Sequence, residues 1–251
     1  MAQDTTVYGR DLYGESRLPQ LLRALCRIDG LRWIRLLYCY PEHITEELLD
    51  VMREEDKVLP YMDLPIQHAS GRVLRAMHRP GDRQTLTATI RRLRERVPGI
   101  VLRTTVMTGF PGETEEDFEE LCAFLQEAKF ERLGCFAFSP EEGTEAATMS
   151  EQVPDELKNR RRDIIMEEQS RIADRYNESC IGSTVTVLVE SFDKYAECWF
   201  GRSAADAPDI DGKVFFSARR GQVKPGDMVR IHITDTLDWD LMGEIADESA
   251  E

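Results

Sequence analysis

Residues 100–121 read IVLRTTVMTGFPGETEEDFEEL, and in them a strand pattern passes through a short turn into a helix pattern. Residues 100–108 are rich in β-branched and aliphatic side chains, which predicts a buried strand. Residues 114–117 resemble a capping box with an acidic first turn, and residues 118–125 place apolar side chains at the spacing of a core-facing helix. This stretch therefore predicts a strand–turn–helix unit.

The same alternation of strands and helices runs from about Met1 to Ser139. We expect strands at residues 33–38, 61–66, 100–108 and 133–138, and helices at residues 45–55, 83–97 and from 114 onward. Such alternation implies parallel strands with helices outside, so the architecture is either a doubly wound sheet or a β/α barrel. Both architectures bind ligands at the carboxyl ends of their strands.

The composition changes after Pro154. We expect a long, highly charged helix over residues 155–179, which suits a connector between two domains. Beyond Gly182 the pattern becomes all β. We expect strands at residues 184–189, 196–202, 213–216, 228–236 and 241–245, with turn residues between them. Five short strands suggest a small barrel of OB-like character. The expected division is residues 1–150, a connecting helix over 151–182, and a β domain over 183–251.

The chain has 251 residues, with 32 Lys and Arg against 47 Asp and Glu, so its formal charge is 32 − 47 = −15. Its 41% hydrophobic content excludes a disordered or collagen-like chain. The apolar runs are far shorter than the roughly 18 residues that a membrane span needs, and no secretory signal is visible. We therefore expect a cytoplasmic protein with no membrane partner. The acidic balance argues against a broad nucleic-acid surface and favours a basic partner.

The six cysteines are too far apart in sequence to form a short metal-binding motif. They are Cys26, Cys39, Cys122, Cys135, Cys180 and Cys198. Iron–sulfur and zinc sites usually place thiolates two to four residues apart, because one loop must wrap the metal. We therefore expect buried, reduced thiols and no metal ligand.

Polar residues follow several of the expected strands. The turn at residues 109–113 is either a tight structural turn or a cradle in which backbone amides meet a ligand, and it is not a P-loop. His68, directly after a strand, is a general base, a ligand, a substrate contact or a structural hydrogen-bonding residue. Asp4 and Asp63 are carboxylates near strands, and an aspartate paired with Arg103 would form a charge-balanced site.

Together these strand ends resemble a known family. Residues 3–9, 64–70, 77–81 and 103–114 resemble methylthiotransferases of the radical S-adenosylmethionine superfamily, and residues 201–212 resemble the TRAM domain of the RimO branch. The resemblance covers essentially the whole chain, with its motifs in matching order. It implies a partial β/α barrel of the radical S-adenosylmethionine type, without its first strand, followed by a small all-β TRAM domain.

The resemblance also implies an activity. In RimO-like enzymes one [4Fe–4S] cluster cleaves S-adenosylmethionine to a radical, which abstracts hydrogen from the β-carbon of an aspartate in small-subunit ribosomal protein 12. A second [4Fe–4S] cluster delivers the sulfur, and another S-adenosylmethionine supplies the methyl group. The cofactor carries the difficult chemistry, while the protein positions it and excludes water. The implied partner is that basic ribosomal protein.

Site residues follow from the matching positions, and they include no assigned catalytic residue and no metal ligand. The positions implied to contact S-adenosylmethionine are Gln3, Asp4, Gln67, His68, Arg103, Thr105, Gly109, Pro111, Glu113 and Ser139, the last beside Phe138 and Pro140. The positions implied to contact the protein substrate are Arg202, Asp206, Asp209 and Asp211. The resemblance favours the cradle interpretation of residues 109–113.

The sequence departs from the family in its cysteines. RimO-like proteins carry three cluster-binding cysteines in an N-terminal domain and a Cys-x3-Cys-x2-Cys loop after the first barrel strand, and this chain has neither. Met1 stands where the family enters its second strand, so we expect the C-terminal part of such an enzyme. We expect it to be inactive alone. We also expect an exposed strand edge that favours aggregation unless an N-terminal part pairs with it.

Two alternatives remain open. A transfer-RNA methylthiotransferase would share the barrel, but residues 183–251 carry seven Lys and Arg against 14 Asp and Glu, or 7 − 14 = −7. That charge disfavours RNA and suits a basic ribosomal protein. A non-catalytic binding module, in which only the TRAM-like domain retains a function, is the second alternative.

Overall fold

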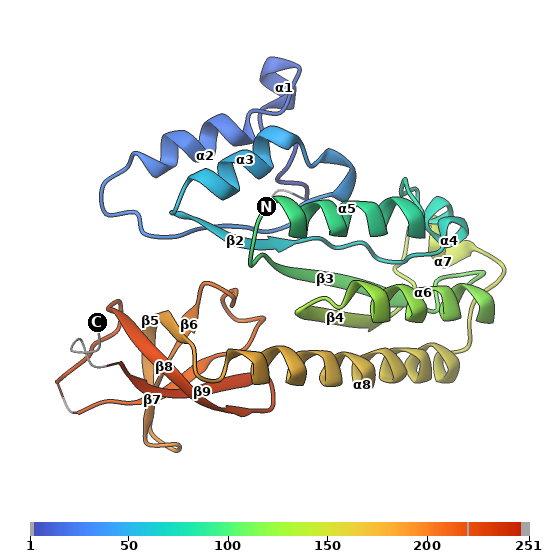
Figure 1. The fold of residues 1–251 in the computed structure, drawn as a ribbon. Helices are drawn as coiled ribbons and strands as arrows, with labels where there is room; N and C mark the ends of the chain where they lie inside the picture. Colours follow the sequence, from blue (N-terminus) through green and yellow to red (C-terminus); the bar gives the residue numbers. More distant parts are fainter. Residues whose placement is uncertain (1–2, 220, 247–251) are drawn as a thin grey trace. The chain divides into compact units, whose positions relative to one another are not determined.

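The computed structural model describes residues 3–219 and 221–246, and the chain forms two compact units, Met1–Gln169 and Ser170–Glu251 (Figure 1). The division falls within one long helix, α8, which spans Asp155–Cys180. The helix expected over residues 155–179 is therefore present, and its residues are shared between the two units.

The first unit is built on a parallel sheet whose strands lie side by side in chain order. The strands are β1 (Ile34–Leu36), β2 (Val58–Asp63), β3 (Val101–Thr108) and β4 (Arg132–Ala137). Each pairs in parallel with the next. A doubly wound sheet reverses its strand order at a switch point, whereas a β/α barrel keeps the sequential order. The sheet is therefore an arc of a β/α barrel, which confirms the expected α/β class.

Helices connect these strands, and several of them begin at side-chain caps. The helices are α1 (Arg10–Tyr13), α2 (Leu18–Cys26), α3 (Glu46–Glu54), α4 (Gly71–Ala76), α5 (Arg83–Arg96), α6 (Glu115–Ala128) and α7 (Glu145–Thr148), with a 3-10 turn at Pro41–His43. Thr45, Asp82 and Thr114 each accept a hydrogen bond from the backbone three residues ahead. Capping of this kind satisfies amides that have no partner within the helix. These three helices begin within one residue of the positions that the sequence predicts.

The main core lies between the sheet and the helices on one of its faces. Leu102 and Val106 of β3 are fully buried there with Met62 of β2. Helices α3 and α6 contribute Leu49 and Leu121 to the same cluster. Burial of one such side chain stabilises the fold by about 1.5–3 kcal/mol. One face of the sheet is therefore apolar. The opposite face carries the alternate residues of each strand, such as Arg103 and Thr105 of β3.

The second unit is a closed five-stranded barrel in the order β5-β6-β7-β9-β8. Its strands are β5 (Thr184–Asp193), β6 (Cys198–Ser203), β7 (Val214–Ser217), β8 (Met228–Leu237) and β9 (Asp240–Ile245). All pairs are antiparallel except β7 with β9. Val187, Phe216 and Ile231 fill its interior. The expected small all-β barrel is confirmed.

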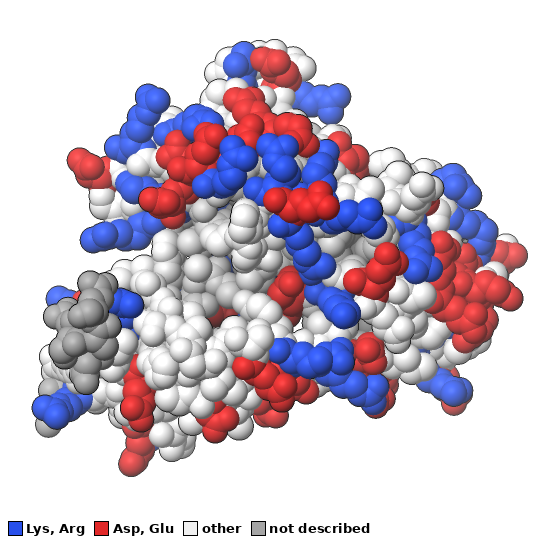
Figure 2. Space-filling view, viewed as in Figure 1, with Lys and Arg blue, Asp and Glu red and all other residues white. Residues whose placement is uncertain are grey.

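Acidic and basic side chains of the first unit are interspersed, and several form ion pairs. Figure 2 shows Lys and Arg interspersed with Asp and Glu over α2, α3 and α5. Arg96 of α5, for example, pairs with Asp50 of α3 at 2.8 Å, and Arg23 of α2 with Glu54 at 2.9 Å. Within the described residues, no helix combines the length and the apolar character that crossing a membrane requires.

The barrel depends on Gly201, where β6 passes close to β5. A Cβ at this position would lie 2.1 Å from the carbonyl oxygen of Leu188, which is backbone and cannot move aside. We predict that Gly201→Ala lowers the free energy of unfolding by about 1–3 kcal/mol through overpacking. Urea denaturation followed by tryptophan fluorescence measures this. Gly134→Ala is the matched control, because its added Cβ would meet nothing nearer than 3.5 Å. Equal stability of the two variants would contradict the packing account.

Candidate functional site

The second face of the parallel sheet is polar and partly open. Leu102, Thr104 and Val106 of β3 are fully buried, whereas Arg103 and Thr105 between them are only partly buried. Successive side chains of a strand point to opposite faces. Arg103 and Thr105 therefore lie on the face of the sheet that the main core does not cover.

Arg103 is held on this face by a buried carboxylate. Asp63, the last residue of β2, is in register with Arg103. Its Oδ1 accepts a hydrogen bond of 2.9 Å from Arg103 Nη1, and its Oδ2 accepts one of 3.0 Å from the amide of Tyr38. The Asp63 side chain is 3% exposed and that of Arg103 is 15% exposed. The aspartate expected beside Arg103 is thus Asp63, and it fixes a cation that solvent can still reach.

Apolar groups lie beside this cation on the same face. Gly134 of β4 is in register with Thr105, and Arg103 Nη2 is 3.9 Å from the position a Gly134 Cβ would take. Phe136, two residues further along β4, is 59% exposed and is in register with Met107. The face therefore offers a guanidinium and a hydroxyl beside an accessible aromatic ring. Such a combination suits a ligand with a charged end and an apolar or aromatic end.

Gln67 is brought to Thr105 through the backbone. Its amide donates to the carbonyl of Thr105 at 2.9 Å, and its own carbonyl accepts from the amide of Met107 at 2.8 Å. Gln67 has a backbone φ of 67°, in the left-handed region that residues other than glycine seldom adopt. Three of the predicted site residues, Gln67, Arg103 and Thr105, therefore lie at one edge of the sheet.

Asp4 lies near the end of β1 and makes different contacts. Its Oδ2 is 2.6 Å from His43 Nδ1, and its Oδ1 accepts from the amide of Thr6 at 2.9 Å. The neighbouring Thr5 donates from its backbone amide to the carbonyl of Tyr38. Gln3 is exposed. Asp4 thus anchors the N-terminal segment beside β1 through His43 and Thr6.

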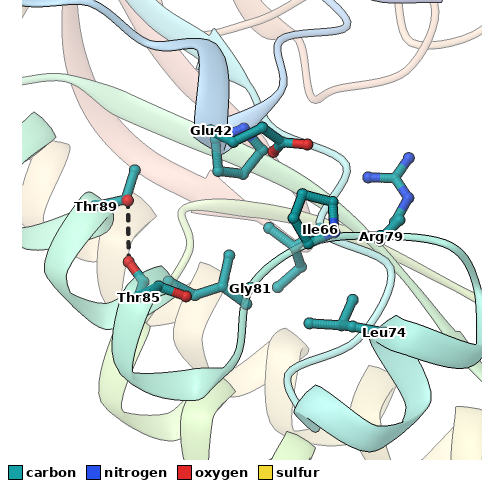
Figure 3. Close-up of a pocket in the computed structure, with 10 residues that line it drawn as sticks. Glu42, Ile66, Leu74, Arg79, Gly81, Thr85 and Thr89 are labelled. Carbon is teal, nitrogen blue, oxygen red and sulfur yellow. Dashed lines mark hydrogen bonds between the residues drawn. The ribbon is translucent and has the colours of Figure 1, made fainter.

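A pocket of about 330 Å³ opens near the residues that follow β2. Ile66 and Leu74 form part of its lining, with Thr85 and Thr89 of α5 on the side opposite Arg79 (Figure 3). Arg79 donates to the carbonyl of Pro65 at 2.9 Å. None of the site residues predicted from the sequence lines this pocket.

A buried cluster surrounds the carboxylate of Glu113 at the end of the turn after β3. Glu113 Oε2 accepts from the amide of Gly109 at 2.7 Å, and Oε1 accepts from Arg161 Nη1 at 2.8 Å. Arg161 Nη2 also donates to Glu115 at 2.7 Å. His68 Nε2 lies 3.5 Å from Glu113 Oε2, and both side chains are fully buried. His68, Gly109 and Glu113 are therefore together, as a second group beneath the turn.

His68 is held by its other ring nitrogen, and it adjoins a second buried carboxylate. Its Nδ1 accepts from the amide of Ser70 at 3.0 Å, so the neutral ring carries its proton on Nε2, facing Glu113. Ser70 Oγ donates to Asp117 at 2.6 Å, and Arg72 also contacts Asp117. Burial opposes ionisation of Asp117, but the hydrogen bonds from Arg72 and Ser70 outweigh it and hold its pKa well below the usual range. These contacts give His68 a structural environment.

Three amides of the turn at residues 109–113, those of Gly109, Gly112 and Glu113, are used within the protein. The Gly112 amide donates to the carbonyl of Glu151, and the Glu113 amide donates to the carbonyl of Phe110. A Cβ at Gly109 would lie 2.1 Å from the Cβ of Lys158 on α8. The close approach that Gly109 permits is therefore to a helix of the same chain. Pro111 follows in the turn, and Ser139 is exposed beyond β4.

Of the predicted substrate residues in the β barrel, Arg202 lies within β6 and the three aspartates lie in the loop after it. Arg202 Nε donates to Glu190 at 2.8 Å. Asp206 is buried and accepts from Ser203 Oγ at 2.6 Å, and Asp211 accepts from the amide of Ala207 at 2.8 Å. These two aspartates shape the loop. Asp209 instead is exposed, with a φ of 65°.

The thiols do not form a metal site within the described residues. No group of three or more histidines, cysteines or carboxylates there could hold a metal ion. Burial raises the pKa of Cys122 to about 11 and of Cys135 to about 12, and it raises the pKa of Cys39 further. Cluster iron binds thiolates, which these groups do not readily form. The described residues therefore do not fit an iron–sulfur cluster.

Sequence reasoning missed the role of Arg161 and of the Tyr38 amide. Arg161 reaches Glu113 from 48 residues away and lies in a helix whose charged residues look uniformly like a solvent face. No local pattern distinguishes it from its neighbours. The Tyr38 contact is a backbone contact and leaves no mark in the residue types.

We predict that thiol accessibility and acidity divide the cysteines into two classes. At pH 8 a raised pKa leaves little thiolate, so Cys39 and Cys135 should react with iodoacetamide at least about tenfold more slowly than Cys198, which is only partly buried. Mass spectrometry of timed samples measures each site. Equal reaction rates for Cys39 and Cys198 in the folded chain would contradict the assignment of buried, neutral thiols.

Family comparisons agree with this architecture. Residues 4–125 match the model of the Radical SAM superfamily, and residues 181–246 match that of the TRAM domain. A solved structure to which the chain is similar is coproporphyrinogen III oxidase HemN of Escherichia coli, a radical SAM enzyme. The TM-score is 0.48 with 20% identity, over 64% of this chain and 36% of that one.

Curated relatives match nearly the whole chain. It is 48% identical over 245 residues to the ribosomal protein uS12 methylthiotransferase RimO of Desulfitobacterium hafniense, covering 98% of this chain and 55% of that protein. It is 50% identical over 246 residues to the protein of the same name from Symbiobacterium thermophilum, covering 97% and 50%. The chain thus spans about half the length of the curated relatives it matches. It carries a domain of the radical S-adenosylmethionine superfamily over residues 4–125 and a TRAM domain over residues 181–246, and it is similar to RimO proteins over nearly its whole length.

Proposed function

We propose that this chain forms the S-adenosylmethionine-binding and substrate-docking portion of a methylthiotransferase that acts on ribosomal protein uS12. The observation that carries the proposal is the Asp63–Arg103 pair on the open polar face of the sheet. The names of the relatives supply the reaction and its protein substrate.

The chemistry of the open face fits S-adenosylmethionine. Its methionine carboxylate would pair with the Arg103 guanidinium, because charge-assisted hydrogen bonds to a fixed cation are the strong ones. The hydroxyl of Thr105 would take part at the same end. Met107 and the exposed ring of Phe136 offer apolar surface for the adenine. When bound, S-adenosylmethionine supplies the radical precursor and the methyl group.

The residues of the chain itself orient this ligand. Asp63 keeps the Arg103 guanidinium in place, since its two carboxylate oxygens are held by Arg103 and by the Tyr38 amide. A cation fixed in advance loses little rotational freedom when it binds an anion. Gln67, which is tied to Thr105 and Met107 through the backbone, borders the same edge.

The iron–sulfur clusters take their ligands from outside this chain. Its cysteines lie far apart in sequence, and no metal-binding group occurs among the described residues. The chain by itself is inactive in methylthiolation on this proposal, although it retains the binding face. No step of the reaction is assigned to its thiols.

The TRAM domain is the part that docks uS12. The net charge of residues 183–251, 7 − 14 = −7, suits a basic protein better than a phosphate backbone. Among the residues implied by the resemblance, Asp209 is the exposed aspartate of the loop after β6, whereas Asp206 and Asp211 bond within that loop. The transfer-RNA alternative requires a basic surface, which this charge disfavours.

We predict that the chain binds S-adenosylmethionine through Arg103. Arg103→Gln should weaken binding about ten- to a hundredfold, which is the effect of losing one charge-assisted hydrogen bond. Isothermal titration calorimetry of the 251-residue chain measures this. Arg91→Gln on the exposed side of α5 is the matched control and should bind as the parent does. Equal affinity of the Arg103 variant, or no binding by the parent chain, would contradict the proposal.

A second prediction concerns uS12. Asp209→Asn removes one negative charge and keeps a residue type that tolerates a positive φ. It should weaken binding to purified uS12 about three- to tenfold, and the difference should shrink as salt rises. Asp238→Asn is the matched control, because Asp238 is also exposed and has a φ of 50°. Biolayer interferometry measures the affinity of both variants for uS12. An equal loss of affinity in both would contradict a specific role for Asp209, because binding would then depend on net charge alone.

A further inference from the structure

We infer that Arg161 of α8 is a positioning residue for the ligand-binding edge of the sheet, acting through Glu113. The inference rests on the proposed function, because it assumes that the carboxyl end of β3 binds S-adenosylmethionine. Arg161 touches no residue of the open face. Its effect would pass through the turn that directly follows β3.

Arg161 is a buried cation whose two terminal nitrogens bond to the start of α6 and to the turn before it. It is 3% exposed. Its Nη1 donates to the Glu113 carboxylate at 2.8 Å and lies 3.3 Å from the Glu113 carbonyl oxygen. Its Nη2 donates to Glu115, and its guanidinium lies 5.2 Å from the centre of the Phe118 ring. The planar fork therefore holds two carboxylates at once, which an ammonium cannot do with the same geometry.

Glu113 passes this constraint on to the strand. Arg161 binds Glu113 Oε1, and the other carboxylate oxygen, Oε2, accepts a hydrogen bond from the amide of Gly109. Gly109 is the first residue after β3. His68, at the end of the segment after β2, lies 3.5 Å from the same oxygen. One carboxylate thus bonds both to the chain after β3 and to α8, and it lies beside the chain after β2.

Helix α8 and the segment just before it fix the turn at further points. Thr108, the last residue of β3, donates from Oγ1 to the carbonyl of Lys158 at 2.9 Å. Gly109 packs so closely on Lys158 that no side chain fits between them. The Gly112 amide donates to the carbonyl of Glu151. The conformation of the turn is therefore set by residues that lie about 40–50 positions later in the sequence.

Removal of Arg161 would leave the Glu113 carboxylate buried without its cation. An unpaired buried charge is strongly unfavourable, so the carboxylate would draw in water or move outward. In either case the amide of Gly109 loses a fixed acceptor. The end of β3 then gains freedom beside Thr105 and Met107, where the ligand is proposed to bind.

The test combines amide exchange with ligand binding in the full chain. We compare Arg161→Gln and Arg161→Lys with the control Arg162→Gln, whose side chain is 38% exposed and pairs with its neighbour Asp163. Hydrogen exchange of the Gly109 amide, followed by NMR, reports the turn. Calorimetry with S-adenosylmethionine reports the binding face. Exchange of the Val187 amide in the β barrel shows whether a variant remains folded elsewhere.

We expect the Gly109 amide of Arg161→Gln to exchange about ten- to a hundredfold faster than in the parent chain, the scale of one lost charge-assisted hydrogen bond. In Arg161→Lys the exchange rate of the Gly109 amide should lie between those of the parent chain and Arg161→Gln, because lysine keeps the positive charge but lacks the planar, two-nitrogen guanidinium. Affinity for S-adenosylmethionine should fall in the same order, while Arg162→Gln behaves as the parent. If Arg161→Gln does not fold, Arg161→Lys against Arg162→Gln decides the question by the same two readings.

Unchanged exchange at Gly109 in the Arg161 variants overturns the inference, whatever the affinity. Faster exchange with unchanged affinity also overturns it, because the role is then structural only. If the parent chain does not bind S-adenosylmethionine, the proposed function fails, and the ligand-positioning role of Arg161 fails with it. In that case the exchange data still show whether Arg161 fixes the turn. The two failures are therefore distinguishable.

Discussion

The first unit depends on one buried carboxylate, that of Glu113. Parallel strands end at a common edge, where each chain leaves the sheet with backbone groups that need partners. Glu113 meets this need by accepting from Gly109 and by pairing with Arg161, while His68 lies against it. A single acceptor thus joins segments that are remote in sequence. The edge that it organises is the one at which β/α proteins bind ligands.

The division of the sheet into two unlike faces follows from the alternation of side chains along β3. Leu102 and Val106 turn toward the helices, and Arg103 and Thr105 turn away from them. Burying an arginine among aliphatic side chains would be costly, so the alternation alone determines which face is the core. Asp63 then converts the exposed arginine into a fixed cation. The scaffold and the binding face are therefore two consequences of one strand pattern.

Local signals in the sequence predict much of the fold because they act over a few residues. The caps at Thr45, Asp82 and Thr114 mark the starts of three helices, and alternation marks the barrel strands. Helix α2 was not predicted, and β2 lies at Val58–Asp63 rather than at residues 61–66. The apolar run from Leu64 to Ile66 is buried without being part of the strand. Burial and strand pairing are separate properties. An apolar run in the sequence predicts that its residues are buried, but not that they pair with a neighbouring strand.

The candidate site was predictable only in part. The residue types of Arg103 and Thr105 were recognised through a family resemblance, but the partner of Arg103 depends on the register between β2 and β3. The two interpretations of Gly109, turn and cradle, differ in what approaches it, and the structure places Lys158 there. Such tertiary contacts leave no local pattern. Arg161 shows the same limit, since it is one of three consecutive arginines and only one of them reaches Glu113.

The central claim is that the polar face of the sheet binds S-adenosylmethionine. The most direct measurement is a two-dimensional NMR titration of the isotope-labelled chain, with residue assignments for both units. The account predicts shifts confined to the amides of Asp63, Arg103 to Met107 and Gly134 to Phe136, with the barrel amides from Thr184 onward unchanged. Shifts confined to the TRAM barrel, or to the pocket beside Ile66 and Leu74, would contradict it.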